Sequence, residues 1–333
     1  MSVKLQKLAI IGGGPGGLAT SRVVLANYPS IEHIDLFVND DNVGGLWYVP
    51  EQTGDKKERV MYDYLETNLP KELMQFSGVP FKNDVSEFPK RQDVFNYLQD
   101  YHTHFIKDNQ KVTIHWNSEV VNVCKTGDNW TVIAEVKDSI DPFKSVYDHV
   151  VSAIGHFKRP YIPESVRGLD DWFTHGAAIH AKDFHNSEFT RGKNVVVVGN
   201  GSSGQDLVNQ VASVAKHAYH SISDITERSP IYVGDPIIST VPRIVATNWD
   251  TRTIELADSQ VLKDIDILIY ATGYLYDLSI FDKEVRKDIT GDVSGISKTV
   301  TNLFSHIFWN KDPTLAFSLI PLGIIPFPLA ELQ

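Results

Sequence analysis

Two short glycine-rich segments carry the spacing best suited to hold a nucleotide. Residues 12–17 follow the apolar run 8–11, and residues 199–204 follow the apolar run 195–198. Both read Gly-x-Gly-x-x-Gly, in which the first glycine permits a tight turn, the second lets a pyrophosphate approach, and the third lets helix and strand pack closely. The phosphates then lie at a helix N-terminus, where free N–H groups favour anions. Two such turns, each after a β-rich run, predict two dinucleotide sites.

A second pattern is also duplicated. Residues 148–155 (DHVVSAIG) match residues 266–273 (DILIYATG), and each run reads as a buried strand that ends at a glycine. The order of the four motifs predicts an α/β fold with two Rossmann-like domains, the second inserted into the first or following it. Prolines and glycines between 155 and 191 indicate the junction.

Composition narrows the partners. The net charge of -11 does not favour binding to nucleic acid or to an anionic membrane surface, because both require clustered Lys and Arg side chains. The single cysteine, Cys124, permits no internal disulfide, no redox pair and no cysteine-based metal cluster, and we expect no metal site. The apolar runs at the two ends are too short or too interrupted by proline for a signal or a transmembrane helix. We therefore expect a cytoplasmic small-molecule enzyme, either free or peripheral to the endoplasmic reticulum.

The end of each predicted second strand departs from the usual ribose-binding pattern. After 34–37, Val38 stands where an acid is expected to hold an adenosine ribose, and Asn39 or Asp40 could substitute, although an ordinary turn is an equal alternative. The strand 217–221 ends at Ser221 without a carboxylate that would repel a ribose 2′-phosphate, which favours NADPH over NADH.

Three basic side chains could pair with that phosphate, although a solvated surface position is the commoner explanation for each. They are Lys216, His220 and Arg228.

Further motifs follow in a fixed order: Gly44-Gly45-Leu46-Trp47, Leu65-Glu66-Thr67-Asn68, Gly155-His156, Pro160, Pro163 and Ala271-Thr272-Gly273-Tyr274. With them the chain resembles the flavin-containing monooxygenases over nearly all of its 333 residues. It is most similar to the fungal, thiol-oxidising branch, through residues 61–68, 199–206 and 326–333.

The resemblance implies that an FAD-binding domain comprises 1–165 and 280–333, cut short at its C-terminus, and that 166–279 binds NADPH. It implies that the first glycine turn holds the FAD pyrophosphate, that Leu46 and Trp47 flank the flavin, and that Thr67 and Asn68 line its junction with the nicotinamide. The full set of expected cofactor contacts is Gly12, Gly13, Gly14, Pro15, Gly16, Gly17, Asn39, Leu46, Trp47, Thr67, Asn68, Gly199, Gly201, Ser202, Ser203, Gly204, Gln205, Asp206, Ser221, Thr272 and Gly273.

The activity that the resemblance implies is transfer of one oxygen atom from O2, through a flavin hydroperoxide, to a soft nucleophile. A thiol or sulfide is the first choice of substrate and an amine the second, and homo-oligomer formation is left open. The cofactor supplies the difficult chemistry. Asn68 is the expected active-site group.

Three other classes of protein share part of this pattern. A disulfide reductase shares the double-nucleotide architecture but needs a cysteine pair, which Cys124 alone cannot supply. A Baeyer–Villiger monooxygenase carries a signature that ends in tryptophan, where this chain has Phe184, after Phe173, Gly176 and His180. His180 is expected to be a packed or capping group rather than a base. The third alternative is a catalytically impaired FAD-binding homologue.

Overall fold

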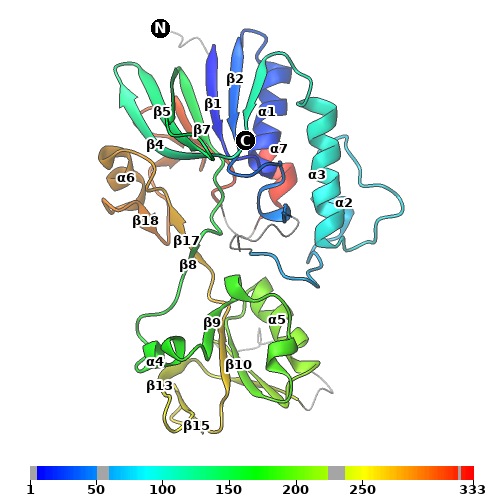
Figure 1. The fold of residues 1–333 in the computed structure, drawn as a ribbon, viewed down its shortest axis with the longest axis vertical. Helices are drawn as coiled ribbons and strands as arrows, with labels where there is room; N and C mark the ends of the chain where they lie inside the picture. Colours follow the sequence, from blue (N-terminus) through cyan, green and yellow to red (C-terminus); the bar gives the residue numbers. More distant parts are fainter. Residues whose placement is uncertain (1–5, 51–59, 224–236, 322–323) are drawn as a thin grey trace. The chain divides into compact units, whose positions relative to one another are not determined.

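The computed structural model describes residues 6–50, 60–223, 237–321 and 324–333. The chain folds into two compact units. The first unit comprises Met1–Glu51, Leu65–Arg159 and Leu275–Gln333, and the second comprises Gln52–Tyr64 and Pro160–Tyr274. In Figure 1 the first unit takes its elements from both ends of the colour scale, whereas the second is mostly green and yellow.

A seven-stranded sheet forms the centre of the first unit, in the order β19-β20-β21-β7-β1-β2-β3. Its strands are β1 (Lys7–Ile11), β2 (His33–Phe37), β3 (Val112–His115), β7 (His149–Ser152), β19 (Leu303–Phe304), β20 (Phe308–Trp309) and β21 (Leu315–Phe317). The strands from β21 to β3 are parallel. This pattern requires helical crossovers, which cover the sheet.

The two faces of this sheet bury different residues of β1, because successive side chains of a strand point to opposite faces. Leu8 and Ile10 join one core, and Ala9 and Ile11 join the other. The first core packs against α1 (Pro15–Asn27), α3 (Arg91–Phe105) and α7 (Pro326–Leu332). The second packs against α6 (Lys283–Thr290) and an antiparallel meander, β4 (Ser118–Thr126), β5 (Asn129–Val136) and β6 (Phe143–Tyr147).

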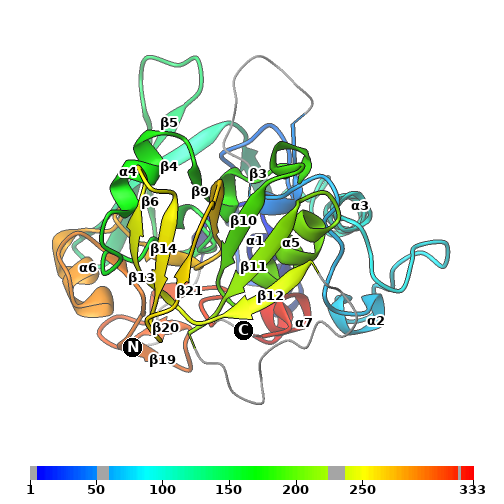
Figure 2. The same ribbon diagram turned by 90° about the horizontal axis from the view of Figure 1, so that it is seen from below.

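The second unit repeats the arrangement with a parallel five-stranded sheet in the order β12-β11-β10-β16-β9. Its strands are β9 (Ala178–His180), β10 (Asn194–Val198), β11 (His217–Ser221), β12 (Ile238–Val241) and β16 (Ile267–Tyr270). Helix α5 (Ser202–Ala212) packs against this sheet, as Figure 2 shows. The antiparallel strands β13 (Ile244–Asn248), β14 (Thr253–Leu256) and β15 (Val261–Leu262) and helix α4 (Leu169–Thr174) complete the unit.

The predicted α/β class with two parallel-sheet dinucleotide-binding units is confirmed, since β7-β1-β2 with α1 corresponds to β16-β10-β11 with α5. The short remaining elements are η1 (Gly45–Trp47), α2 (Lys71–Met74), β8 (Arg159–Pro160), η2 (Ala181–Asp183), η3 (Glu188–Thr190), β17 (Tyr274–Asp277) and β18 (Ile296–Ser297). Within the described ranges, the helices are too short or too polar to cross a membrane.

The chain passes between the units at Arg159–Pro160 and Tyr274–Leu275, a few residues before the boundaries expected from the sequence. A further segment, Gln52–Tyr64, belongs to the second unit, and the proline and glycine pattern gave no sign of it. Tyr62 explains this placement, because its buried ring packs edge-on against Phe184 and its hydroxyl donates a hydrogen bond to Asp206.

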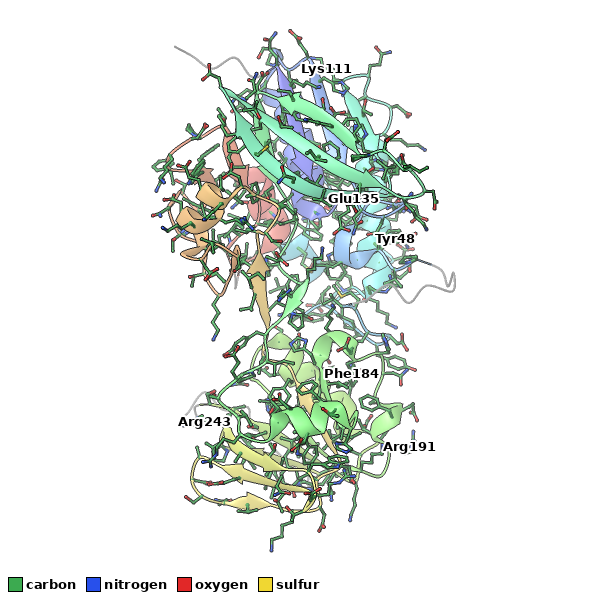
Figure 3. The ribbon with its side chains drawn as sticks, turned by 60° about the vertical axis from the view of Figure 1, so that its left-hand side comes forward. Tyr48, Lys111, Glu135, Phe184, Arg191 and Arg243 are labelled. Carbon is green, nitrogen blue, oxygen red and sulfur yellow. The ribbon has the colours of Figure 1, made fainter. Side chains whose placement is uncertain are left out.

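A buried carboxylate lies at the contact between the first sheet and its meander. Asp35 of β2 is 4% exposed, and its carboxylate accepts hydrogen bonds from Tyr147 at 2.8 Å, from His115 at 2.7 Å and from His33 at 3.1 Å. Burial would raise the pKa of Asp35, but the hydrogen bonds from His115 and Tyr147 hold it below its ordinary value. The network therefore joins β2, β3 and β6. Figure 3 shows the meander that it supports, with Glu135 labelled on it.

Asp35→Asn should lower the free energy of unfolding at pH 7 by about 1–3 kcal/mol, because buried partners lose a charged acceptor. A carboxylate whose pKa is lowered by folding stabilises the protein above its unfolded-state pKa, about 3.9, and this contribution disappears as the pH falls through the folded pKa. The difference from wild type should therefore be complete at pH 7 and shrink below about pH 4. Urea denaturation at pH 7 and at pH 3 measures it, with exposed Asp128→Asn as the control. A full-sized difference that persists at pH 3 contradicts the account.

Candidate nucleotide sites

The first glycine turn is shaped by contacts that leave no room for side chains. Gly12 has φ +113°, and a Cβ there would lie 2.3 Å from the carbonyl oxygen of Ala153, at the end of β7. A Cβ on Gly17 would lie 1.9 Å from the carbonyl oxygen of Gly12. Gly14 differs, because its Cβ would meet only the Cα of Gly45, at an ordinary 3.6 Å. The first and third glycines are thus required by the fold, whereas the second is not.

The second glycine turn has the same geometry. Gly199 has φ +121°, and its Cβ would lie 2.3 Å from the carbonyl oxygen of Ala271, at the end of β16. A Cβ on Gly204 would lie 2.0 Å from the carbonyl oxygen of Gly199, while one on Gly201 would meet nothing within 4 Å. A glycine with open space on its Cβ side is what close approach of a pyrophosphate requires.

Both helices begin in a way that suits an anion. Gly14 and Gly201 are the N-cap residues of α1 and α5, and neither supplies a side-chain cap to the first-turn N–H groups. Pro15 is the first residue of α1, where it removes one of those donors at no cost. The remaining N–H groups, at the positive end of the helix dipole, fit the phosphates of a dinucleotide.

The other glycines of the first turn bring flanking elements close. A Cβ on Gly13 would lie 2.7 Å from a methyl group of Val38, and one on Gly16 would lie 2.8 Å from the hydroxyl of Ser318. Val38 is consequently buried against the turn. Its apolar side chain cannot replace the acid that would accept hydrogen bonds from a ribose. Asn39, the next residue, is exposed and lines a cavity.

Leu46 and Trp47 belong to η1, which lies directly against the first turn. The N–H of Gly44 donates to the carbonyl of Gly13 at 2.8 Å, and a Cβ on Gly45 would lie 2.9 Å from the Cα of Gly14. The Trp47 ring packs edge-on against Phe327 of α7, with a centroid distance of 6.5 Å. The structure thus brings the start of η1, at Gly44 and Gly45, to the second glycine of the turn.

Thr67 and Asn68 lie on a loop of the first unit. Thr67 is buried, and its hydroxyl donates to the carbonyl of Leu69 at 2.9 Å while its N–H donates to the carbonyl of Pro89 at 3.0 Å. Asn68, the next residue, is exposed. Thr67 therefore holds the loop on which Asn68 is exposed.

In the second unit the expected contacts lie at the start of α5. Ser202, Ser203 and Gln205 are exposed there, and the amide of Gln205 donates to the backbone carbonyl of Asn200 at 3.2 Å. The carboxylate of Asp206 accepts hydrogen bonds from Tyr62 and, at 3.2 Å, from the amide of Gln210. Burial raises the pKa of Tyr62, and Asp206 raises it further, so the hydroxyl remains a donor. Asp206 thus anchors the segment that contains Tyr62.

The side chains at the end of β11 are buried and form hydrogen bonds within the fold. Ser221 is buried and donates its hydroxyl to the carbonyl of Pro242 at 3.0 Å. The buried ring of His220 donates from Nε2 to the carbonyl of Gly199 at 2.7 Å. Burial lowers the pKa of His220, which keeps the ring neutral.

The suggestion that His220 pairs with a phosphate is therefore wrong, because the ring is fully buried and its Nε2 proton is donated inside the fold. Lys216 is also unsuitable, since it precedes β11, whereas ligands of such sheets bind at the carboxyl ends of the strands. Arg228 lies outside the described residues.

Thr272 and Gly273 follow β16 and contact Tyr161. The hydroxyl of Thr272 donates to the carbonyl of Tyr161, whose N–H donates to the carbonyl of Gly273 at 2.9 Å. His180 also donates to the Gly273 carbonyl, at 3.1 Å, and its other ring nitrogen accepts from the N–H of Lys182 at the start of η2. Burial lowers the pKa of His180. His180 is thus the packed capping group that the sequence suggested.

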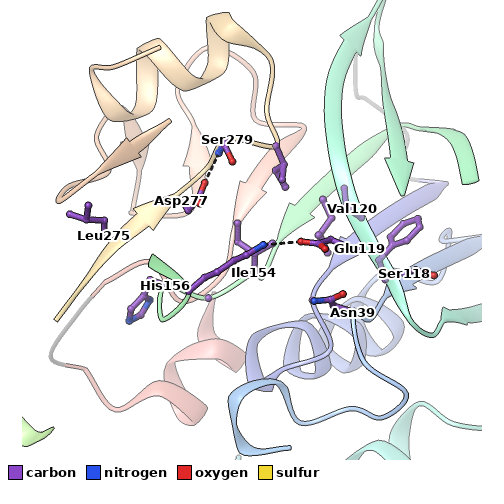
Figure 4. Close-up of a pocket in the computed structure, with 15 residues that line it drawn as sticks. Asn39, Ser118, Glu119, Val120, Ile154, His156, Leu275, Asp277 and Ser279 are labelled. Atoms are coloured by element: carbon purple, nitrogen blue, oxygen red, sulfur yellow. Dashed lines mark hydrogen bonds and ion pairs between the residues drawn. The ribbon is translucent and has the colours of Figure 1, made fainter. Parts of the chain in front are cut away.

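One cavity lies entirely within the first unit, at the carboxyl ends of β1 and β2 (Figure 4). Its lining includes Gly12 and Asn39, the loop that follows β7 from Ile154 to Lys158, and the start of β4 from Ser118 to Val120. Sequence reasoning missed the β4 residues, because nothing in their pattern connects them with the glycine turn. Only the topology brings β4 beside the end of β2.

Two sheets with parallel central strands, each with an uncapped helix behind a glycine turn, define a fold with two dinucleotide-binding (Rossmann-like) units. The family model described as flavin-binding monooxygenase-like matches residues 5–227. The chain is 44% identical over 332 residues to the thiol-specific monooxygenase of Saccharomyces cerevisiae, covering 98% of this chain and 75% of that protein. It is 34% identical over 299 residues to the trimethylamine monooxygenase of Pelagibacter ubique, covering 85% and 64%.

The structure of S-allyl-L-cysteine S-oxygenase from Allium sativum superposes with a TM-score of 0.83 at 28% identity, covering 99% of this chain and 76% of that one. This chain belongs to the flavin-binding monooxygenase-like family. The expected family is thereby confirmed, and so is the activity class, a flavin-dependent monooxygenase.

Gly204→Ala should lower the free energy of unfolding by about 1–3 kcal/mol, because its Cβ must displace the backbone of Gly199. Gly201→Ala should change it by no more than about 1 kcal/mol, since the new methyl group meets open space and φ is -77°. Urea denaturation of the two variants and the wild type measures both effects. Equal destabilisation by the two substitutions would refute the claim that the fold requires the third glycine of the turn but not the second.

Proposed function

We propose that this chain uses FAD and NADPH to transfer one oxygen atom from O2 to the sulfur of a small thiol or sulfide. The observation that carries the proposal is the duplicated glycine turn whose second glycine is not needed for packing: a Cβ on Gly201 would meet nothing within 4 Å, and one on Gly14 would make only ordinary contact with Gly45, at 3.6 Å. Two such turns provide one site for the flavin nucleotide and one for the nucleotide that reduces it.

We assign FAD to the first unit on two grounds. Gly45, which precedes Leu46 and Trp47 in η1, lies against Gly14 of the turn, and the isoalloxazine half of an extended FAD would begin there. A cavity lined by Gly12 and Asn39 lies at the carboxyl ends of β1 and β2, and the adenosine half would occupy it. Both sets of residues belong to the domain that comprises 1–51, 65–159 and 275–333.

NADPH is assigned to the second unit, with Gly199, Gly201 and Gly204 forming the turn and with Ser202, Ser203 and Gln205 exposed beside it. The β11 end supports NADPH over NADH, because Ser221 and Ile222 are buried and no carboxylate follows directly. Asp206 takes part indirectly in this proposal, by fixing Tyr62 against α5.

The bound flavin would supply the oxygen-transfer chemistry, and the protein residues would bind and orient it. The first-turn N–H groups of α1 would hold the pyrophosphate, Thr67 would fix the loop, and the Asn68 amide, which can both donate and accept, would orient the reacting edge. A sulfur substrate is proposed because the relative with 44% identity is named as thiol-specific and the structural relative as an S-oxygenase. The trimethylamine monooxygenase makes a tertiary amine the second choice.

The direct test follows NADPH and NADH oxidation by the purified, FAD-loaded protein with glutathione, cysteine or trimethylamine. We expect consumption to rise with a thiol, and catalytic efficiency to be at least about tenfold higher with NADPH, a difference of roughly 1.4 kcal/mol. Stimulation by the amine alone would overturn the choice of sulfur. Equal efficiency with the two nucleotides would overturn the assignment of NADPH.

Asn68→Asp should leave flavin binding nearly intact, because the phosphate-binding glycines are unchanged. It places a carboxylate where a neutral donor and acceptor is required, at a cost of roughly 1–3 kcal/mol to the hydrogen bonds at the reacting edge. We expect NADPH oxidation to continue while the oxygenated product falls and hydrogen peroxide rises. Measuring the ratio of product to NADPH checks this, with exposed Asn96→Asp as the control. An unchanged ratio removes Asn68 from the active site.

A further inference from the structure

The first unit lacks the acid that dinucleotide-binding folds place at the end of the second strand to accept the hydroxyls of the adenosine ribose. Val38 stands at this position and is buried against Gly13. Asp35, which lies earlier on β2, already accepts hydrogen bonds from Tyr147 and two histidines. Asp41 accepts a hydrogen bond from Tyr48 at 2.6 Å. Asn39 lines the cavity at the end of β2, whereas Asp40 and Asp41 do not. An acid that reaches the ribose hydroxyls in this cavity must therefore come from another part of the first unit.

The cavity at the end of β2 contains two carboxylates, those of Glu119 and Asp277. Asp277 accepts a hydrogen bond from the N–H of Ser279 at 3.2 Å. In Figure 4, Asn39 and Glu119 lie on one side of the cavity and Asp277 lies on the other. Glu119 is therefore the acid on the same side as the end of β2.

The local structure of β4 gives Glu119 no role in holding the strands together. Its direct cross-strand neighbour on β5 is Glu135, and like charges in that arrangement destabilise a strand pair. The register of β4 shifts between Val120 and Asn122, immediately after Glu119. Such bulges redirect side chains and are frequent beside binding sites.

One cation fixes the direction of the Glu119 carboxylate. Lys158, on the loop after β7, donates to Glu119 Oε1 at 2.8 Å, and both residues line the cavity. Their side chains are 73% and 47% exposed, so this ion pair contributes little to stability. Its effect is to hold the carboxylate at the cavity, with the second oxygen left for another donor.

We propose that Glu119, together with the amide of Asn39, accepts the adenosine ribose hydroxyls of FAD in place of the missing acid after β2, and that Lys158 positions the Glu119 carboxylate. The carboxylate accepts from the hydroxyls, and the Asn39 amide can both donate and accept. The inference rests on the proposed binding of FAD to the first unit.

The test uses the full chain freed of flavin and titrated with two ligands, FAD and the FAD analogue whose adenosine carries 2′-deoxyribose. Quenching of flavin fluorescence gives each dissociation constant. We expect the wild type to prefer FAD by about tenfold, and Glu119→Ala to weaken FAD binding by about tenfold with little effect on the analogue, which abolishes the preference. Glu87→Ala, an exposed residue of the first unit outside the cavity lining, is the matched control and should behave as wild type.

A second pair of variants keeps the proposal testable if Glu119→Ala does not fold, as circular dichroism would reveal. Lys158→Met should weaken FAD binding several-fold and reduce the preference, and Lys158→Arg should restore both. Glu119→Ala with an unchanged preference overturns the inference, and so does a Lys158→Met variant that binds as wild type. A wild type that binds FAD without the preference also overturns it, whereas a wild type that binds no FAD overturns the cofactor assignment instead.

Discussion

The contact between the first glycine of each turn and the carbonyl at the end of the neighbouring strand determines how both sites are built. Gly12 packs on Ala153, and Gly199 packs on Ala271. In both cases a Cβ on the glycine would lie 2.3 Å from the carbonyl oxygen of the alanine. This contact brings β1 next to β7 and β10 next to β16, and it directs the chain into the helix that follows. The helix start is therefore fixed by the backbone, and the N–H groups of its first turn face the space that the second glycine leaves open.

Much of this arrangement could be predicted from the sequence, because it depends on residue types at fixed spacing. Local patterns define the glycine turns and the duplicated DHVVSAIG and DILIYATG runs. The order of these motifs along the chain indicates the insertion of one unit into the other. Where a positive φ coincides with a close backbone contact, glycine is the only residue that fits. Such positions can therefore be recognised in the sequence as glycines at fixed spacing.

The features that were missed depend on side chains meeting across long stretches of sequence. The segment with Tyr62 joins the second unit through Asp206, 144 residues away, and Asp35 meets Tyr147 across 112 residues. His220 looked like a surface cation, yet β11 turns its ring inward to the carbonyl of Gly199. Alternation along a strand could have indicated this burial, but the hydrogen-bond partner could only be found in the fold. Glu119 likewise reaches the end of β2 only through the topology of the meander.

The central claim is that each glycine turn holds one nucleotide independently of the other. Isothermal titration of the flavin-free protein with FAD and with NADP+ tests it, using Gly14→Val and Gly201→Val to place a side chain where each pyrophosphate would approach. The account predicts one site for each ligand, with loss of FAD binding alone in the first variant and of NADP+ binding alone in the second, while circular dichroism shows both folded. Loss of NADP+ binding in folded Gly14→Val together with retained FAD binding would contradict it.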